Sequence, residues 1–154
     1  GRVLGFYTGG TLASEAKILL TRAGVDCEIL DLGDDQYTAG RPHPMIDPEA
    51  RANKIIEAGF DSSVGIILLD VVLGFGAHPD PATPVAAAAT AARSAAESNG
   101  RRLEFVASVC GTSGDPQGIE RQRAILRDAG IILAETNASA VRFIAAQQTG
   151  ASTS

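Results

Sequence analysis

Residues 64–81 read VGIILLDVVLGFGAHPDP and indicate both a fold and a place for chemistry. The first ten residues, 64–73, are apolar except for Gly65 and Asp70, which is typical of a strand covered on both faces. The remainder holds two glycines, a histidine and two prolines, so we expect a loop, and Thr83-Pro84 then opens a helix. A buried strand, a glycine-rich loop and a helix start form the arrangement at which open α/β proteins bind ligands.

The same alternation of strand and helix runs through the rest of the chain. Apolar runs predict five strands, while glycines, prolines and capping residues predict the ends of five helices. The strands are expected at 3–8, 26–32, 64–73, 103–109 and 131–134, and the helices at 11–23, 48–58, 84–99, 116–129 and 137–147, with Asp47, Thr83 and Asn137 as N-caps.

Strict alternation predicts a parallel sheet with right-handed crossovers and helices on both faces. Five such units most often adopt the strand order 2-1-3-4-5. The expected fold is therefore an α/β, flavodoxin-like three-layer sandwich. We assign residues 1–148 to this domain and residues 149–154 to a flexible tail.

The composition limits the classes of function. The 154 residues suit one ordinary domain, and the net charge of −5 argues against non-specific nucleic-acid binding. No apolar run reaches the roughly 20 residues of a membrane span, and the N-terminus has no signal-peptide pattern. Cys27 and Cys110 lie in apolar runs, so we expect both to be buried in a protein of the reducing cytoplasm. We expect a cytoplasmic protein whose partners include neither nucleic acid nor membrane.

The loops that follow the strands are the expected place for a ligand. In this fold they open at one edge of the sheet, where the helix N-termini present free N–H groups and partial positive charge to an oxyanion. Three of these loops are rich in glycine and hydroxyl groups, which allow close approach of a ligand to the backbone. Small residues are also what a tight strand-to-helix turn requires, and that alternative stays open for each loop. The candidate phosphate- or cofactor-binding residues are Gly9, Gly10, Thr11, Gly74, Gly76, Gly111, Thr112 and Ser113.

Three titratable residues are candidates for catalysis. His43 and His78, the two histidines of the chain, both lie in the expected loops and could act as acid, base, phosphoryl acceptor or anion ligand. A solvated or loop-bracing histidine is the alternative for each. Asp70 lies late in a buried strand and needs partners there. It is either catalytic or a structural residue that holds loop N–H groups or a histidine.

Two further features are weaker candidates. The acidic run at residues 31–35 could bind a metal ion, but such a run is more often a solvated turn, so no metal site is predicted. Cys110 could be an activated thiol at a strand end near a helix start, but no basic residue stands beside it in the sequence.

Several segments resemble those of a known family. They are YTGGTL at 7–12, DLGDDQYTAGRPHPMID at 31–47, LLDVVLG at 68–74, GAHPDP at 76–81 and GTSGDPQ at 111–117, and they span most of residues 3–145. With them the chain resembles the flavodoxin-like CoA-ligase domain of the NDP-forming acyl-CoA synthetases, such as succinyl-CoA synthetase. Within that superfamily it most resembles the C-terminal domain of FdrA-type proteins, to which the HPMID and AHPDP segments are the most specific.

The resemblance implies a domain of a ligase or a carbamoyltransferase. In the synthetases two such domains pack together, and their helix N-termini embrace a phosphohistidine loop; the glycine loops here match the phosphate-embracing positions. The family's phosphohistidine segment, Gly-His-Ala-Gly, is absent, so the resemblance does not transfer that role to His43 or His78. FdrA-like proteins are linked to carbamoyl transfer, which needs an oxyanion cradle but no phosphohistidine.

The implied partners follow from this family. The substrate would be a small anion such as an acyl phosphate, a carbamoyl phosphate or a carboxylate. No covalently bound cofactor is expected, whereas phosphate, CoA or a nucleotide would bind together with the rest of the parent enzyme. An upstream domain or sister subunit is expected, in a homo- or hetero-oligomer.

Three other readings stay open. The chain could be a non-catalytic docking or dimerisation domain, because it has no nucleotide-grasp segment or dinucleotide fingerprint. A flavin-binding module is faintly indicated by residues 8–11, with Tyr37 and Phe75 as stacking aromatics. A signalling receiver would need acidic residues after the first strand and a lysine after the last, where this chain has residues 8–10 and 135–137 instead.

Overall fold

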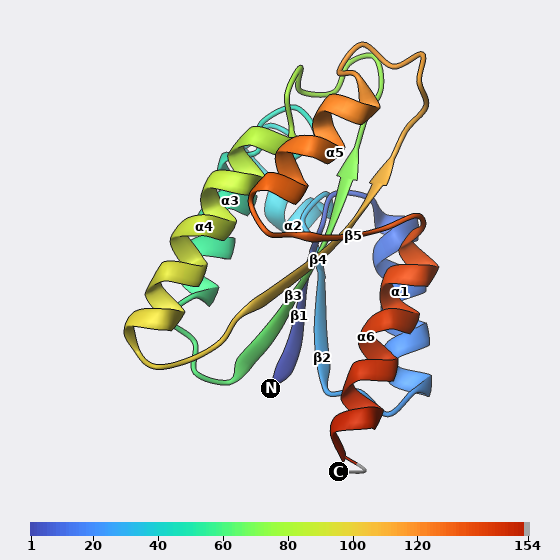
Figure 1. The fold of residues 1–154 in the computed structure, drawn as a ribbon. Coiled ribbons are helices and arrows are strands. Elements are labelled where there is room, and N and C mark those ends of the chain that lie inside the picture. Colours follow the sequence, from blue (N-terminus) through green and yellow to red (C-terminus); the bar gives the residue numbers. More distant parts are fainter. Residues whose placement is uncertain (153–154) are drawn as a thin grey trace.

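The chain forms a three-layer α/β sandwich around one parallel sheet (Figure 1). The computed structural model describes residues 1–152. All strand pairs are parallel, in the order β2-β1-β3-β4-β5, which confirms the predicted fold class and strand order. The strands are β1 (Arg2–Tyr7), β2 (Cys27–Asp31), β3 (Val64–Val72), β4 (Glu104–Cys110) and β5 (Ile132–Ala134).

The helices cover both faces of the sheet. They are α1 (Gly10–Arg22), α2 (Asp35–Thr38), α3 (Glu49–Ala58), α4 (Ala82–Ser98), α5 (Ile119–Asp128) and α6 (Asn137–Ser152). Helices α1 and α6 pack together on one face, while α3, α4 and α5 lie on the other (Figure 1). Because side chains alternate along a strand, Leu69 and Val71 belong to the core under α3–α5, whereas Leu68 and Val106 belong to the core under α1 and α6.

The loops that follow the strands gather at the carboxyl edge of the sheet, as expected of parallel strands. This edge is at the top of Figure 1, and both ends of the chain lie toward the bottom. The predicted site residues outside β3 therefore lie in loops or helix starts at a single edge.

Helix α4 begins earlier than the sequence predicts, and helix α5 begins later. Helix α4 begins at Ala82, so Thr83 is not its N-cap; Thr83 instead donates its N–H and hydroxyl to the carboxylate of Asp80 at 3.3 and 2.6 Å. Helix α5 begins at Ile119 and not at residue 116, because the chain first makes a turn that ends at Gly118 with φ of 75°.

The start of α6 also differs from the prediction. Asn137 is the first helical residue, and the cap is a reciprocal pair in which the Thr136 hydroxyl accepts the Ser139 N–H and the Ser139 hydroxyl accepts the Thr136 N–H, both at 3.0 Å. The Asn137 side chain is thereby free to bond inside the domain. At α3, Asp47 does accept a first-turn N–H, that of Glu49 at 3.0 Å, although the helix begins two residues after it.

The acidic run contains a short helix that the sequence analysis missed. Helix α2 begins after Asp34, whose carboxylate accepts the N–H of Gln36 at 3.2 Å. Nearby, the Asp31 carboxylate accepts the N–H of Gly33 at 2.9 Å. These contacts are those of acidic turn and capping residues. Among residues 1–152, no group of three or more His, Cys, Asp or Glu side chains is arranged to hold a metal ion.

The last helix extends beyond its predicted end at residue 147. It continues to Ser152, so the boundary predicted at residue 148 falls inside α6, and residues 149–152 of the predicted tail are helical. Ala145 and Ala146 are strong helix formers, and Thr149 donates its hydroxyl to the Ala145 carbonyl at 2.9 Å. Residues 153–154 lie outside the described part of the chain.

The cysteines are less buried than the sequence predicts. Cys27 is half-buried, and Cys110 is exposed. Cys110 is the last residue of β4 and lies beyond Ser108, the last β4 residue that pairs with β5. Its thiol is therefore reachable at the carboxyl edge.

Candidate functional site

Asp70 holds the loop between β1 and α1. It lies on β3, and its fully buried carboxylate accepts the N–H of Thr8 at 2.9 Å, the hydroxyl of Thr8 at 3.0 Å and the N–H of Gly9 at 2.9 Å. Loop N–H binding was one of the two structural roles considered for this residue. No histidine of the described chain contacts the Asp70 carboxylate through a hydrogen bond or ion pair.

The partner of Asp70 is Arg51, which sequence analysis did not select. The Arg51 side chain is 3% exposed, and its Nη1 donates to Asp70 Oδ1 at 2.8 Å, to the Asp70 carbonyl at 2.6 Å and to the Phe6 carbonyl at 3.3 Å. Burial lowers the pKa of the Arg51 guanidinium, against the opposing effect of the Asp70 charge. A signal was present, since Arg51, Ile55 and Ala58 share the buried face of α3, and a charge on such a face requires a buried counter-charge.

This ion pair lies at the crevice between β1 and β3. The crevice is the topological switch point of the sheet, because the chain moves from β1 outward to β2 in one direction and to β3 in the other. Arg51 bridges the carbonyl of Phe6 on β1 to that of Asp70 on β3. The position at which open α/β sheets commonly bind a ligand is thus occupied by the protein's own guanidinium and carboxylate.

The two histidines occur in equivalent His-Pro turns. Nδ1 of His43 accepts the N–H of Met45 at 3.1 Å, and Nδ1 of His78 accepts the N–H of Asp80 at 3.0 Å. These bonds assign the proton of each neutral ring to Nε2. The N–H of His78 donates to the Met45 carbonyl at 2.7 Å, so the structure brings the two histidine loops side by side.

His43 also lies over the loops after β1 and β2. A Cβ placed on Gly33 would be 2.5 Å from His43 Nε2 and 3.0 Å from the Thr8 carbonyl oxygen. The half-buried ring therefore packs closely against these two loops. Both histidines brace loops, and each keeps one donor, Nε2–H, for another partner.

The other glycine loops are partly closed by the chain's own side chains. Gly74 exchanges two hydrogen bonds with the Gln117 amide, at 3.1 and 2.7 Å, and Gln117 also donates to the His78 carbonyl at 3.2 Å. In the loop after β4, the Thr112 N–H donates to the Asp115 carboxylate at 2.6 Å. Gly111 packs against Leu73 so closely that a Cβ would lie 2.8 Å from that side chain.

The first turn of α1 remains open. Its N-cap, Gly9, supplies no side-chain acceptor, and the N–H groups of Gly10, Thr11 and Leu12 have no acceptor within residues 1–152. One carboxylate stands close by, since a Cβ placed on Gly10 would be 2.9 Å from Asp31 Oδ2. Of the predicted loop residues, Gly10 and Thr11 therefore keep unpaired donors, whereas the N–H groups of Gly9, Gly74 and Thr112 are used internally.

The family relationship accords with this fold. A model of the CoA-ligase family matches residues 6–147. The chain belongs to the CoA-ligase family. It is also similar to the uncharacterized protein YahF of Escherichia coli (strain K12), at 44% identity over 108 residues.

The match to YahF covers 70% of this chain and 21% of YahF. The chain thus spans about 21% of the length of the curated relative. Membership in the CoA-ligase family supports a succinyl-CoA synthetase-like domain, as the resemblance implied. No helix within residues 1–152 combines the length and the apolar character needed to cross a membrane.

Proposed function

We propose that this domain takes part in acyl-CoA ligation or carbamoyl transfer within a larger enzyme, and that it binds phosphate or an acyl or carbamoyl phosphate at the carboxyl edge of the sheet. Membership in the CoA-ligase family supports the proposed class of reaction. The observation that carries the proposed binding is the first turn of α1, where three consecutive N–H groups have no protein acceptor.

The fixed loop before α1 supports this binding position. Because Asp70 already holds the N–H groups of Thr8 and Gly9, the next three N–H groups, of residues 10–12, are directed to the N-terminal end of the helix. A helix N-terminus carries about half a positive charge, which favours a phosphoryl group. The loop need not be reordered when the anion arrives, which lowers the cost of binding.

In this proposal the histidines act on the bound group. N–H donors that face the phosphoryl oxygens stabilise the charge that develops when an acyl–oxygen bond breaks. His43, which packs over Gly33 and the Thr8 carbonyl, presents Nε2–H as a donor for the leaving phosphate. CoA and any nucleotide would bind together with the remainder of the parent enzyme.

A nuclear magnetic resonance (NMR) titration tests the proposed binding. We expect phosphate and carbamoyl phosphate to shift the amide signals of residues 10–12 in a saturable way. Asp31→Asn should tighten binding roughly threefold, because it removes a negative charge beside the site while keeping the acceptor for Gly33. Asp26→Asn is the matched control, since it removes one charge at the opposite edge of the sheet.

The titration can contradict the proposal in two ways. Unchanged amide signals at residues 10–12 would exclude binding at the first turn of α1. Equal effects of the Asp31 and Asp26 substitutions would show only a general response to net charge.

A second candidate function, docking without catalysis, is favoured by two exposed apolar side chains. Phe75 is 87% exposed between Gly74 and Gly76, both of which have positive φ. Ile46 is 59% exposed on the histidine loop that hydrogen-bonds to residue 78. Under this alternative, Phe75→Ser would weaken assembly of the full-length protein, and His43→Ala would leave its turnover unchanged. Loss of turnover with His43→Ala in an intact assembly supports catalysis.

A further inference from the structure

A cleft between α1 and α6 offers a second place for a ligand. Its volume is about 390 Å³, and it opens above the carboxyl end of β4 between the first turns of the two helices. Its lining includes Leu12 and Glu15 of α1, Ser108 and Cys110 of β4, and Glu135 and Asn137 at the start of α6. We refer to it as the α1–α6 cleft.

Ser108 places an unpaired hydroxyl in this cleft. The residue is 3% exposed, and it lies on the same face of β4 as Val106, which packs in the core under α1 and α6. Its hydroxyl has no hydrogen-bond partner within residues 1–152. The adjacent Asp70 carboxylate is fully engaged by Thr8, Gly9 and Arg51. The hydroxyl is not one of the fully buried unpaired side-chain atoms of residues 1–152, which are Nε of Arg2 and Nε of Arg51, so it reaches the surface of the cleft, where it can bond to a ligand or to water.

The walls of the cleft are held in position by Asn137. Its Oδ1 accepts the hydroxyl of Tyr7 at 2.6 Å, and its Nδ2 donates to the Leu12 carbonyl at 2.9 Å and to Glu15 Oε1 at 2.8 Å. Burial, together with the charges of Asp70 and Glu15, raises the pKa of the Tyr7 hydroxyl, so that it stays protonated and continues to donate. Helices α1 and α6 are therefore tied together, and Glu15 is fixed at the rim.

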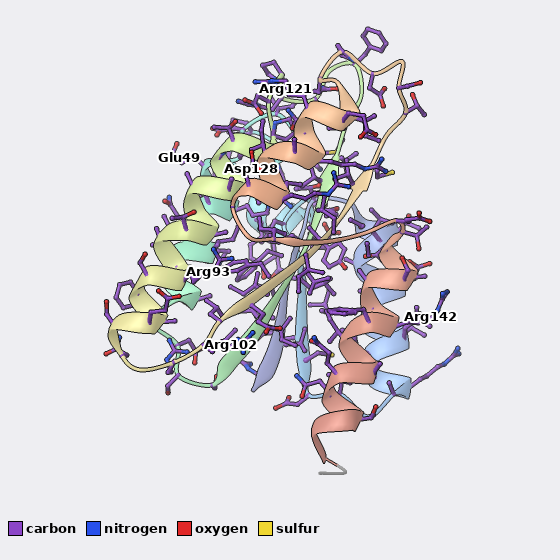
Figure 2. The ribbon with its side chains drawn as sticks, viewed as in Figure 1. Glu49, Arg93, Arg102, Arg121, Asp128 and Arg142 are labelled. Carbon is purple, nitrogen blue, oxygen red and sulfur yellow. The ribbon has the colours of Figure 1, made fainter. Side chains whose placement is uncertain are left out.

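The charges around the cleft indicate which ligand fits. Glu15 and Glu135 are exposed at its rim, and no lysine or arginine lines it. Arg142 of α6 lies on the solvent side of that helix (Figure 2). A phosphate would face two carboxylates without a compensating cation. A neutral carbonyl oxygen would instead accept the Ser108 hydroxyl at the base of the cleft. Adjacent N–H groups would donate to the carboxylates of Glu15 and Glu135 at the rim.

We propose that the α1–α6 cleft binds a primary amide group of a small ligand, whose carbonyl oxygen accepts the Ser108 hydroxyl and whose NH₂ donates to Glu15. Glu135 adds negative charge at the rim and disfavours carboxylates. The inference does not rest on the proposed phosphate site: the two places share Leu12, but residues 10 and 11 do not line the cleft.

An NMR titration of the protein with acetamide tests this assignment, with acetate and methylammonium as matched probes. We expect acetamide to shift the amide signals of residues 108–111 and 136–138 in a saturable way, and both other probes to bind more weakly. Ser108→Ala should weaken acetamide binding roughly fivefold because one hydrogen bond is lost, and Glu15→Gln by a similar factor because a neutral amide oxygen is a weaker acceptor than a carboxylate. Ser94→Ala, on the exposed side of α4, is the control and should leave the affinity unchanged.

Three outcomes would overturn the inference. Acetate binding at least as tightly as acetamide would make the cleft an anion site. Absence of saturable shifts would show that the cleft holds water alone. Unchanged acetamide affinity in the folded Glu15→Gln variant would remove Glu15 from recognition, even if Ser108→Ala failed to fold.

Discussion

Two neighbouring regions at one edge of the sheet use polar groups in opposite ways. At the crevice between β1 and β3, Arg51 and Asp70 form a buried ion pair and fix the loop through Thr8 and Gly9, and Arg51 Nε alone is left without a hydrogen-bond partner in the described part of the chain. In the α1–α6 cleft, the hydroxyl of Ser108 has no protein partner within residues 1–152 and is reachable from the cleft. The adjacent residues Asp70 and Ser108 stand opposite each other on β3 and β4.

The polar groups of the first region stabilise the fold, whereas those of the second remain available to a ligand. A closed polar network costs much to break and leaves little for a ligand to bind. A hydroxyl that only water reaches in the free protein adds little to folding and remains available to a ligand that pairs with it.

Breaking the ion pair between Arg51 and Asp70 should have the largest effect on the free energy of unfolding. Arg51→Met should lower the free energy of unfolding by about 3–5 kcal/mol, because it leaves the buried Asp70 charge without its partner. Urea denaturation measures the loss. Arg41→Met, on the exposed loop before α3, is the matched control and should cost little. A loss as small as that of the control would mean that the ion pair does not hold the fold.

A pair of hydroxyl deletions sharpens the comparison. Thr8→Val should cost about 1–2 kcal/mol, since the buried Thr8 hydroxyl bonds to Asp70 at 3.0 Å. Ser108→Ala should stay within about 0.5 kcal/mol of the wild type, because no bond is lost. Thermal unfolding of both variants distinguishes the two environments. Equal losses would show that Ser108 has a partner in the folded protein.

The smallest effect concerns Asp80, which anchors the start of α4 beside the His78 loop. Burial alone would raise the pKa of Asp80, but bonds from Thr83 and Gln122 and the charge of Arg121 hold it below its ordinary value. Figure 2 shows Arg121 on α5 near the loops of the carboxyl edge. The stabilisation is therefore present above the unfolded pKa of about 3.9 and is lost as the pH falls through the lower folded value.

Asp80→Asn should reduce stability at neutral pH by about 0.5 kcal/mol, because it keeps an acceptor oxygen but removes the negative charge at the start of α4 and beside Arg121. The difference from the wild type should shrink as the pH falls below the range in which Asp80 ionises. Urea denaturation at pH 7 and at acidic pH measures this. A difference that does not depend on pH would assign the effect to packing instead.

The fold was predictable because its signals are local and repeated. Five apolar runs separated by helix starts and stops specify a parallel sheet, and the order 2-1-3-4-5 follows from the number of units. Helix starts were less predictable. Thr83-Pro84 and Asp115-Pro116 match common starting patterns, yet Asp80 and the positive φ of Gly118 determine where α4 and α5 begin.

The gathering of the candidate residues at one edge of the sheet was predictable, but the N–H and O–H donors that the fold leaves unpaired were not. The chain pattern places His43, His78 and the glycine loops together, and the hydrogen bond from His78 to the Met45 carbonyl joins the two histidine loops. Arg51 and Asp70 meet only in three dimensions, because they come from a helix and a strand on different parts of the chain. The Ser108 hydroxyl is unpaired because neither α1 nor α6 supplies a hydrogen-bond partner for it within residues 1–152. The sequence alone does not reveal the absence of such a partner.

One NMR experiment tests the central claim most directly: a single labelled sample titrated first with phosphate and then with acetamide. We expect two separate sets of saturable shifts, one at residues 10–12 and one at residues 108–111 with 136–138. We also expect that neither ligand displaces the other. The contradicting result is a set of shifts around Arg51 and Asp70 with either ligand and no shifts at the two predicted places. It would show that the crevice between β1 and β3 is the binding site.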